Sequence, residues 1–108
     1  MAMLDESRAF ANEGLSVDVI KSQGSPLKGA GIPGTSLTPE QRAHFQSQVD
    51  YLYNRFSGAV KAGRKRVSDE ALKGSTFYGS EAKRLGLIDS VASLETAIRD
   101  AAAMAKIR

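Results

Sequence analysis

Apolar residues in the middle of the chain recur at intervals of three and four, the spacing of one face of an α-helix. They are Phe45, Val49, Leu52, Phe56 and Val60. Polar residues such as Gln46, Asp50 and Asn54 fall between them and lie on other faces. The pattern predicts one long amphipathic helix from Thr38 to Gly63. Because such a helix cannot bury its apolar stripe alone, neighbouring segments or other copies of the chain must pack on it.

Both ends of this helix carry residues that helix termini favour. Thr38 can act as the N-cap, Pro39 suits the first helical position, and Gln41 can complete a capping box with Thr38. Gly63 suits the C-terminal stop. The basic residues around this stop are Lys61, Arg64, Lys65 and Arg66. They could bind phosphates, but a helix C-terminus favours cations and no aromatic residues are interleaved. A solvated helix end is therefore the favoured interpretation.

A second pattern, strict alternation, runs from Leu15 to Ile20. Leu15, Val17 and Val19 face one way, and polar residues separate them, which is the period of a β-strand. Leu87-Ile88 is a second, brief candidate. A single strand makes no sheet, so it must pair with another copy or with sequence outside this chain. This is the first indication that the chain is part of something larger.

Shorter helices are predicted on both sides of the long one: Leu4–Asn12, Asp69–Lys73, Glu81–Leu85 and Leu94–Ala105. Ser68, Ser80 and Ser93 stand where they can cap the last three. Gly14 and Gly86 follow the first and third as C-terminal stops. The chain is therefore expected to be mostly helical, with one or two strands.

Composition excludes several kinds of site. The chain of 108 residues has no cysteine, so it has neither disulfides nor thiolate metal sites, and its single histidine, His44, cannot form a His-rich site. His44 is expected to be a half-exposed helix residue. The net charge of +3 is too mild to demand a nucleic-acid partner. No apolar run is long enough to span a membrane, and we expect neither a signal peptide nor a cofactor.

The segment before the long helix, 21–37, is rich in Gly, Ser and Pro. Composition alone favours a flexible connector, yet a long loop inside a compact domain is often functional. Lys28 stands at its centre, and Gly29 and Gly31 would let the backbone approach another chain or a ligand closely. A lysine can be a general base when burial lowers its pKa from about 10.4 and a serine lies within reach. From the residues alone, a solvated loop lysine remains favoured. The loop also lacks the Gly-Lys-Ser/Thr ending of a P-loop.

Several runs in the chain together resemble the C-terminal half of family S49 serine peptidases. They are Val19–Ser22, Lys28–Gly34, Leu37–Gln41, the spaced residues between Val49 and Arg64, and Phe77–Val91. This family includes the signal peptide peptidase A proteins and the phage capsid maturation proteases. The last run is shared more loosely across the Clp protease and crotonase superfamily. The resemblance implies an α/β fold, of which residues 1–108 would form a single C-terminal fragment.

The resemblance also implies a Ser/Lys dyad in which Lys28 is the general base. The loop is slightly longer than the family pattern, so Lys21 is a weaker alternative. The family's nucleophilic serine lies upstream of the segment that this chain matches, and no serine here lies in the required Gly-rich turn. We therefore expect an inactive fragment, with Lys28 solvated, whose parent hydrolyses peptide bonds in the cytoplasm or in association with a phage capsid.

The expected partners are the upstream half of the same protein, a polypeptide substrate and further copies of the chain. The residues expected to join copies are Phe45, Val49, Leu52 and Phe56. The alternative from another class is a non-catalytic helical module for binding or assembly, such as a phage structural protein. A Gly-rich serine turn upstream of Met1 would favour the peptidase.

Overall fold

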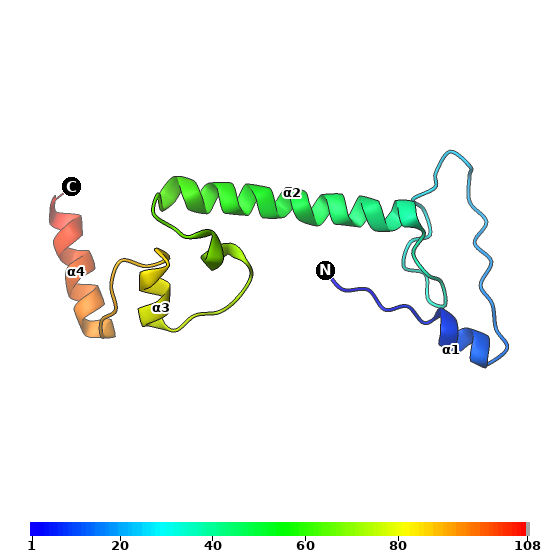
Figure 1. Ribbon diagram of the computed structural model, residues 1–108, viewed down its shortest axis with the longest axis horizontal. Helices are drawn as coiled ribbons and strands as arrows, with labels where there is room; N and C mark the ends of the chain where they lie inside the picture. The colour runs from blue at the N-terminus through cyan, green and yellow to red at the C-terminus, as the bar shows by residue number, and fades with distance from the viewer. Residues whose placement is uncertain (108) are drawn as a thin grey trace. The chain divides into compact units, whose positions relative to one another are not determined.

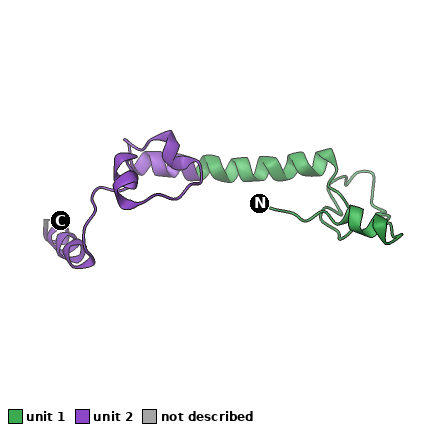
Figure 2. Cartoon of the chain, turned by 60° about the horizontal axis from the view of Figure 1, so that its bottom comes forward, with its two compact units in different colours: residues 1–55 green, residues 56–108 purple. Residues whose placement is uncertain are grey.

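The computed structural model describes residues 1–107, which are mostly helical (Figure 1). In chain order the elements are α1 (Ser7–Asn12), α2 (Pro39–Gly63), the 3-10 helix η1 (Asp69–Leu72), α3 (Gly79–Arg84) and α4 (Leu94–Ile107). Two compact units, Met1–Arg55 and Phe56–Arg108, divide the chain within α2 (Figure 2). Each unit is described by itself below.

Helix α2 confirms the long helix predicted from the apolar spacing. Its capping box is formed in both directions: the Gln41 amide donates to the Thr38 hydroxyl at 3.2 Å, and the Thr38 amide donates to the Gln41 side-chain oxygen at 3.0 Å. The helix begins at Pro39 and ends at Gly63, as expected. The entry of the chain into α2 is thus fixed by two hydrogen bonds between neighbours in sequence.

Helix α1 begins at Ser7, three residues later than the predicted start at Leu4. The Asp5 carboxylate accepts hydrogen bonds from the Ser7 amide at 2.9 Å and from the Ser7 hydroxyl at 2.6 Å. A carboxylate that bonds the backbone two residues on favours a turn over a continuing helix, which explains the later start. The predicted stop is confirmed, because Gly14 has φ +74° and the Leu15 amide donates to the Phe10 carbonyl.

The two predicted strands are absent, because the described residues contain no β-ladder. Leu15–Ile20 runs between α1 and the loop without a neighbouring strand, and a strand needs one to bond its amides and carbonyls. The Leu87 amide instead donates to the Ala82 carbonyl at the end of α3, so Leu87-Ile88 completes a helix terminus. The described chain is therefore helical, and the expected α/β architecture is not found within it.

The second unit has a small apolar core, made by Ala71, Leu72, Ala82 and Leu85. The Ser68 amide donates to the Leu85 carbonyl at 2.9 Å, which joins the start of η1 to the end of α3. The predicted cap by Ser68 is confirmed, since its side chain accepts from the Glu70 amide. The predicted cap by Ser80 is wrong: α3 begins at Gly79, and its N-cap is Tyr78 without a side-chain bond.

Arg64 ties the end of α2 to the turn after α3 within this unit. Its Nε donates to the Gly86 carbonyl at 2.7 Å, and its guanidinium pairs with Asp89 at 2.6 Å. Gly86 has φ +83°, and a Cβ there would lie 2.6 Å from the Arg66 carbonyl oxygen. Only glycine permits both this backbone conformation and this approach.

Helix α4 starts as predicted and extends two residues beyond the predicted end at Ala105. The Ser93 hydroxyl accepts from the Thr96 amide at 3.2 Å, which confirms the predicted cap. The larger residues of its apolar face, Leu94 and Ile98, are exposed. Across the described residues, no helix is both long enough and apolar enough to cross a membrane.

Candidate functional site

The loop 21–37 consists of successive turns held by short-range backbone hydrogen bonds. The Ser25 amide donates to the Ser22 carbonyl at 3.0 Å, and the Lys28 amide donates to the Ser25 carbonyl at 3.1 Å. A further turn is closed by the bond from the Thr35 amide to the Ile32 carbonyl, at 3.1 Å. The Gly- and Pro-rich composition is therefore used for turns, and Lys28 lies in a folded stretch of chain.

The side chains of Lys21, at the start of the loop, and Gln41, in the first turn of α2, both bond the backbone at the centre of the loop. Lys21 Nζ donates to the carbonyl oxygens of Pro26 and Lys28, at 3.0 and 3.2 Å. Gln41 Nε2 donates to the same two oxygens, at 3.4 and 3.2 Å. We call these two donors and two acceptors the carbonyl clamp. Both lone pairs of each carbonyl are used, so the backbone on either side of Leu27 is fixed.

Gln41 connects the loop to α2. Its side chain is only 4% exposed, and it is the one buried polar or charged residue among the described residues. Its side-chain oxygen accepts from Thr38 in the capping box, while its NH₂ group supplies half of the carbonyl clamp. One buried amide thus satisfies the start of the helix and orients the loop. The sequence pattern identified only the capping role, because the clamp acts across 13 and 15 residues.

Gly29, directly after Lys28, lets the loop approach the segment Leu15–Ile20. It has φ +81°, and a Cβ at this position would lie 2.8 Å from Val19 Cγ1. The sequence predicts a close approach to another chain or a ligand, whereas the approach found at Gly29 is to Val19 of the same chain.

Lys28 itself is exposed, and among the described residues its ammonium group has neither a hydrogen bond nor an ion pair. Only its backbone takes part in the carbonyl clamp. The nearby serines do not bond it either: the Ser22 hydroxyl accepts from the Gly24 amide at 3.2 Å, and Ser25 contributes its backbone to the turns. The described residues thus hold a lysine on a fixed loop without a serine partner.

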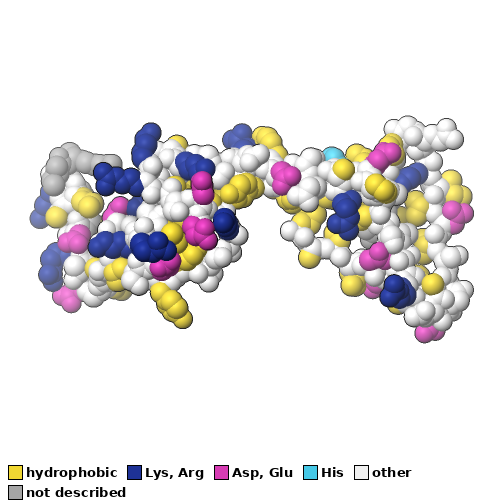
Figure 3. Space-filling model, viewed as in Figure 1, with side chains coloured by type: hydrophobic (Ala, Val, Ile, Leu, Met, Phe, Trp, Pro, Cys, Tyr) yellow, Lys and Arg dark blue, Asp and Glu magenta, His cyan; other side chains and the backbone are white. Residues whose placement is uncertain are grey.

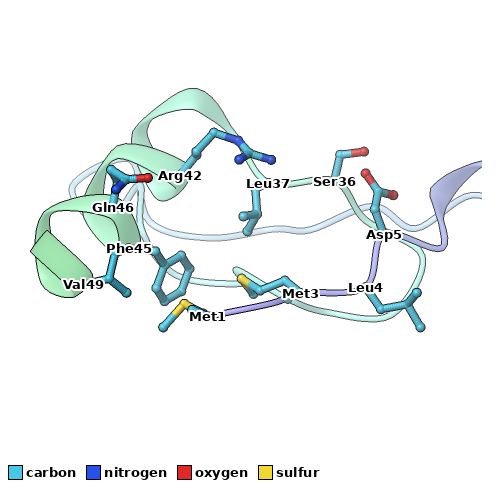
Figure 4. Close-up of a pocket in the computed structure, with 11 residues that line it drawn as sticks. Met1, Met3, Leu4, Asp5, Ser36, Leu37, Arg42, Phe45, Gln46 and Val49 are labelled. Carbon is cyan, nitrogen blue, oxygen red and sulfur yellow. The ribbon is translucent and has the colours of Figure 1, made fainter. Parts of the chain in front are cut away.

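A pocket of about 310 Å³ lies elsewhere in the same unit, and Lys28 does not line it (Figure 4). Its apolar part is formed by Met1, Met3, Leu4, Leu37, Phe45 and Val49. Its polar rim includes Asp5, and hydrogen bonds from the Ser7 hydroxyl, the Ser7 amide and the Ser36 hydroxyl lower the pKa of that carboxyl to about 2. Asp5 is therefore an anion at neutral pH, and in Figure 4 it lies beside Ser36 at the side of the pocket away from α2.

The remaining candidates have structural roles or lie at the surface. His44 is exposed and contacts the Phe45 ring with a centroid distance of 6.0 Å. In the basic run, Lys61 pairs with Asp69 at 2.9 Å and Arg64 holds Gly86 and Asp89. Lys65 and Arg66 are exposed. Lysine and arginine side chains (dark blue in Figure 3) are numerous in this second unit, at the ends of its helices.

Known proteins with similar sequences are described as proteases or putative proteases. The chain belongs to peptidase family S49, whose sequence model, described as Peptidase family S49, matches residues 1–108. It is 34% identical over 87 residues to "Protease 4" of Salmonella typhi, covering 78% of this chain and 14% of that protein. It is 34% identical over 101 residues to a "Putative protease" of Synechocystis, covering 91% of this chain and 36% of that protein.

A third relative comes from an archaeon. A "Putative protease" of Methanocaldococcus jannaschii is 28% identical over 97 residues, covering 87% of this chain and 30% of that protein. The chain thus spans between about one seventh and about one third of the length of these relatives. The family resemblance inferred from the sequence runs is confirmed, and the membership supports a peptidase.

Proposed function

We propose that this chain is the lysine-bearing C-terminal part of a serine endopeptidase with a Ser/Lys dyad, in which Lys28 is the general base. One observation carries the proposal: in a chain of an S49 peptidase, Lys28 projects from a loop whose backbone is fixed on the first turn of α2. A base must be held at a defined position to take a proton from a nucleophile.

The hydrogen bonds favour Lys28 over Lys21 for this role. Lys21 Nζ donates to two carbonyls of the carbonyl clamp, so its ammonium group is committed to holding the loop. A general base must be able to reach the nucleophile, and a side-chain nitrogen bonded to two backbone carbonyls is held away from that task. Lys28 has no such partner among the described residues.

The reaction would be acyl transfer in two steps. A serine hydroxyl, supplied by a part of the protein outside this chain, attacks the scissile carbonyl while Lys28 takes its proton. Lys28 gives this proton to the leaving amine as the peptide bond breaks, which leaves an acyl-enzyme and a neutral lysine. Lys28 then takes a proton from the water that attacks the ester, and gives it to the serine oxygen as the second product leaves. The chain alone lacks the nucleophile and is expected to be inactive.

The same proposal accounts for the unpaired segment Leu15–Ile20. Leu15 and Val17 are 57% and 37% exposed, although they lie on the apolar face of a segment that alternates like a half-buried strand. In the full-length protein we propose that this segment pairs with strands from outside the chain, in a sheet of the Clp protease/crotonase type. The backbone amides and carbonyls of residues 16–20 would then be satisfied.

Hydrolysis of unstructured peptides by the full-length protein tests the assignment. Lys28→Met keeps the length of the side chain and removes the amine, so we expect the rate to fall by a factor of at least about 10². The matched control is Lys83→Met, an exposed lysine on α3, which should leave the rate unchanged. Full activity of Lys28→Met would overturn the proposal, and Lys21→Met would then be the next variant.

We also propose that copies of the chain associate through α2, because its apolar stripe is incompletely covered. Leu52 and Phe56 are 63% and 60% exposed, while Phe45 and Val49 are half-buried. Large exposed apolar side chains in one helix are typical of an interface. Light scattering should give a mass above that of one chain, and Leu52→Asp should lower it. A monomer at high concentration would contradict this proposal. Association of an inactive full-length protein would favour the helical assembly module instead.

A further inference from the structure

We propose that Lys21 and Gln41 are positioning residues for Lys28: their side chains fix the loop backbone, through the carbonyl clamp, so that the ammonium group of Lys28 is presented in one place. The inference rests on the proposed role of Lys28 as general base. It adds two residues that need not touch the substrate.

The geometry of the carbonyl clamp is specific to the lysine loop. The two acceptors belong to Pro26 and to Lys28 itself, and each receives one bond from an ammonium and one from an amide. Three of the four distances lie between 3.0 and 3.2 Å. Moving the Lys28 backbone would therefore break its bonds to Lys21 and to Gln41 at once. A charged donor also makes a stronger bond than a neutral one.

Gln41 gives the carbonyl clamp a rigid support. Its backbone lies in the first turn of α2, and its side-chain oxygen is held by the capping box. Gln41 is only 4% exposed, so loss of the two carbonyl acceptors would leave the NH₂ group of a buried side chain without these partners. The loop has to stay against the helix for this amide to be satisfied.

The need for such support follows from the composition of the loop. Gly24, Gly29 and Gly31 widen the conformational freedom of its backbone, and Lys28 adds a long flexible side chain. A misplacement of about 1 Å can cost a catalytic group about 10²-fold in rate. The Lys21 side chain at the start of the loop and the Gln41 side chain on α2 supply this restraint.

The chain offers variants that separate positioning from folding. Gln41→Glu keeps a side-chain oxygen for the capping box, where Glu and Gln are equivalent, but removes both donors of the carbonyl clamp. Lys21→Met keeps the aliphatic stem and removes the ammonium. Lys21→Arg restores a cationic donor and is the rescue variant. Helix content by circular dichroism should be the same in all three and in the wild type.

The experiment measures kcat and KM of the full-length protein for these variants beside Lys28→Met. We expect Gln41→Glu and Lys21→Met to lower kcat by a factor of about 10 to 10², with KM changed less than about threefold, and Lys21→Arg to recover most of the loss. Hydrogen exchange in the same proteins should rise at the amides of Ser25 and Lys28 and stay unchanged in the middle of α2.

The outcomes separate this inference from the function on which it rests. Full activity of Lys28→Met would remove the base and this inference with it. Loss of activity in Lys28→Met, together with normal kcat in Gln41→Glu and Lys21→Met, would overturn only the positioning role. Equal loss in Lys21→Met and Lys21→Arg, or a loss that appears in KM alone, would also overturn it, because a positioning cation should be replaceable by another cation.

Discussion

Each of the two units is stabilised internally by a different kind of interaction. In the first unit no apolar side chain is buried, and the one buried residue is Gln41, whose hydrogen bonds join the loop to α2. In the second unit four apolar residues form a core, and Arg64 adds a polar tie. The unit that presents Lys28 thus depends on directional bonds, and the other depends on burial.

The difference matters because the two kinds of force fail differently. Burial is non-directional, so a small core tolerates shifts but loses free energy in proportion to the volume removed. Hydrogen bonds fix atoms within a few tenths of an ångström, but each contributes only about 1 kcal/mol net to folding. A loop that must hold one side chain at a defined position is therefore better restrained by hydrogen bonds than by burial. The following predictions test this contrast, from the largest expected effect to the smallest.

Leu85→Ala should have the largest effect on stability. Leu85 is 3% exposed in the core of the second unit, so we expect a loss of about 2 to 4 kcal/mol in unfolding free energy, from lost burial and the cavity that remains. Urea unfolding followed by far-UV circular dichroism measures it. Leu94→Ala is the control, since Leu94 is exposed and its truncation should cost less than about 0.5 kcal/mol. Equal costs at the two positions would mean that the small core does not hold the second unit.

Gly86→Ala should come next, with a loss of about 2 kcal/mol or more from backbone strain and steric clash. The new Cβ would lie 2.6 Å from the Arg66 carbonyl oxygen, which is backbone and cannot turn aside. The matched control is Gly74→Ala: Gly74 has φ +88° but nothing within 4 Å of the added Cβ, so it measures the strain alone. The difference between the two, from thermal unfolding, is the cost of the clash. No difference would show that the close approach at Gly86 is not kept in solution.

The smallest effect concerns the pH dependence of the first unit. Asp5 has a pKa of about 2 in the folded chain, below the ordinary value of 3.8, because Ser7 and Ser36 donate hydrogen bonds to its carboxylate. A lowered folded pKa means that this contribution to stability is present above about pH 4 and is lost as the pH falls towards 2. An NMR titration of the Asp5 carboxyl should give a midpoint near 2 in the wild type and a higher one in Ser7→Ala. Equal midpoints would assign the shift to another cause.

Local chemistry was readable from the sequence. The capping box of Thr38 and Gln41, the caps at Ser68 and Ser93 and the stops at Gly14 and Gly86 all involve partners within five residues. The pattern could identify them because such bonds depend on residue type and spacing alone. The start of α1 and the cap at Ser80 were predicted wrongly. At Asp5 a competing side-chain bond to Ser7 favoured a turn, and α3 begins at Gly79, two residues before the predicted start at Glu81, so Ser80 lies inside the helix.

The sequence by itself determined the family, the long helix with its ends, and Lys28 as the candidate base. Only the tertiary structure decided that Leu15–Ile20 stays unpaired in the described chain, and that Lys21 and Gln41 both bond the Lys28 carbonyl. The physical reason is distance along the chain. A β-strand forms only when a neighbouring strand bonds its backbone. A hydrogen bond across 13 residues does not depend on any regular spacing of residue types, so no sequence pattern predicts it.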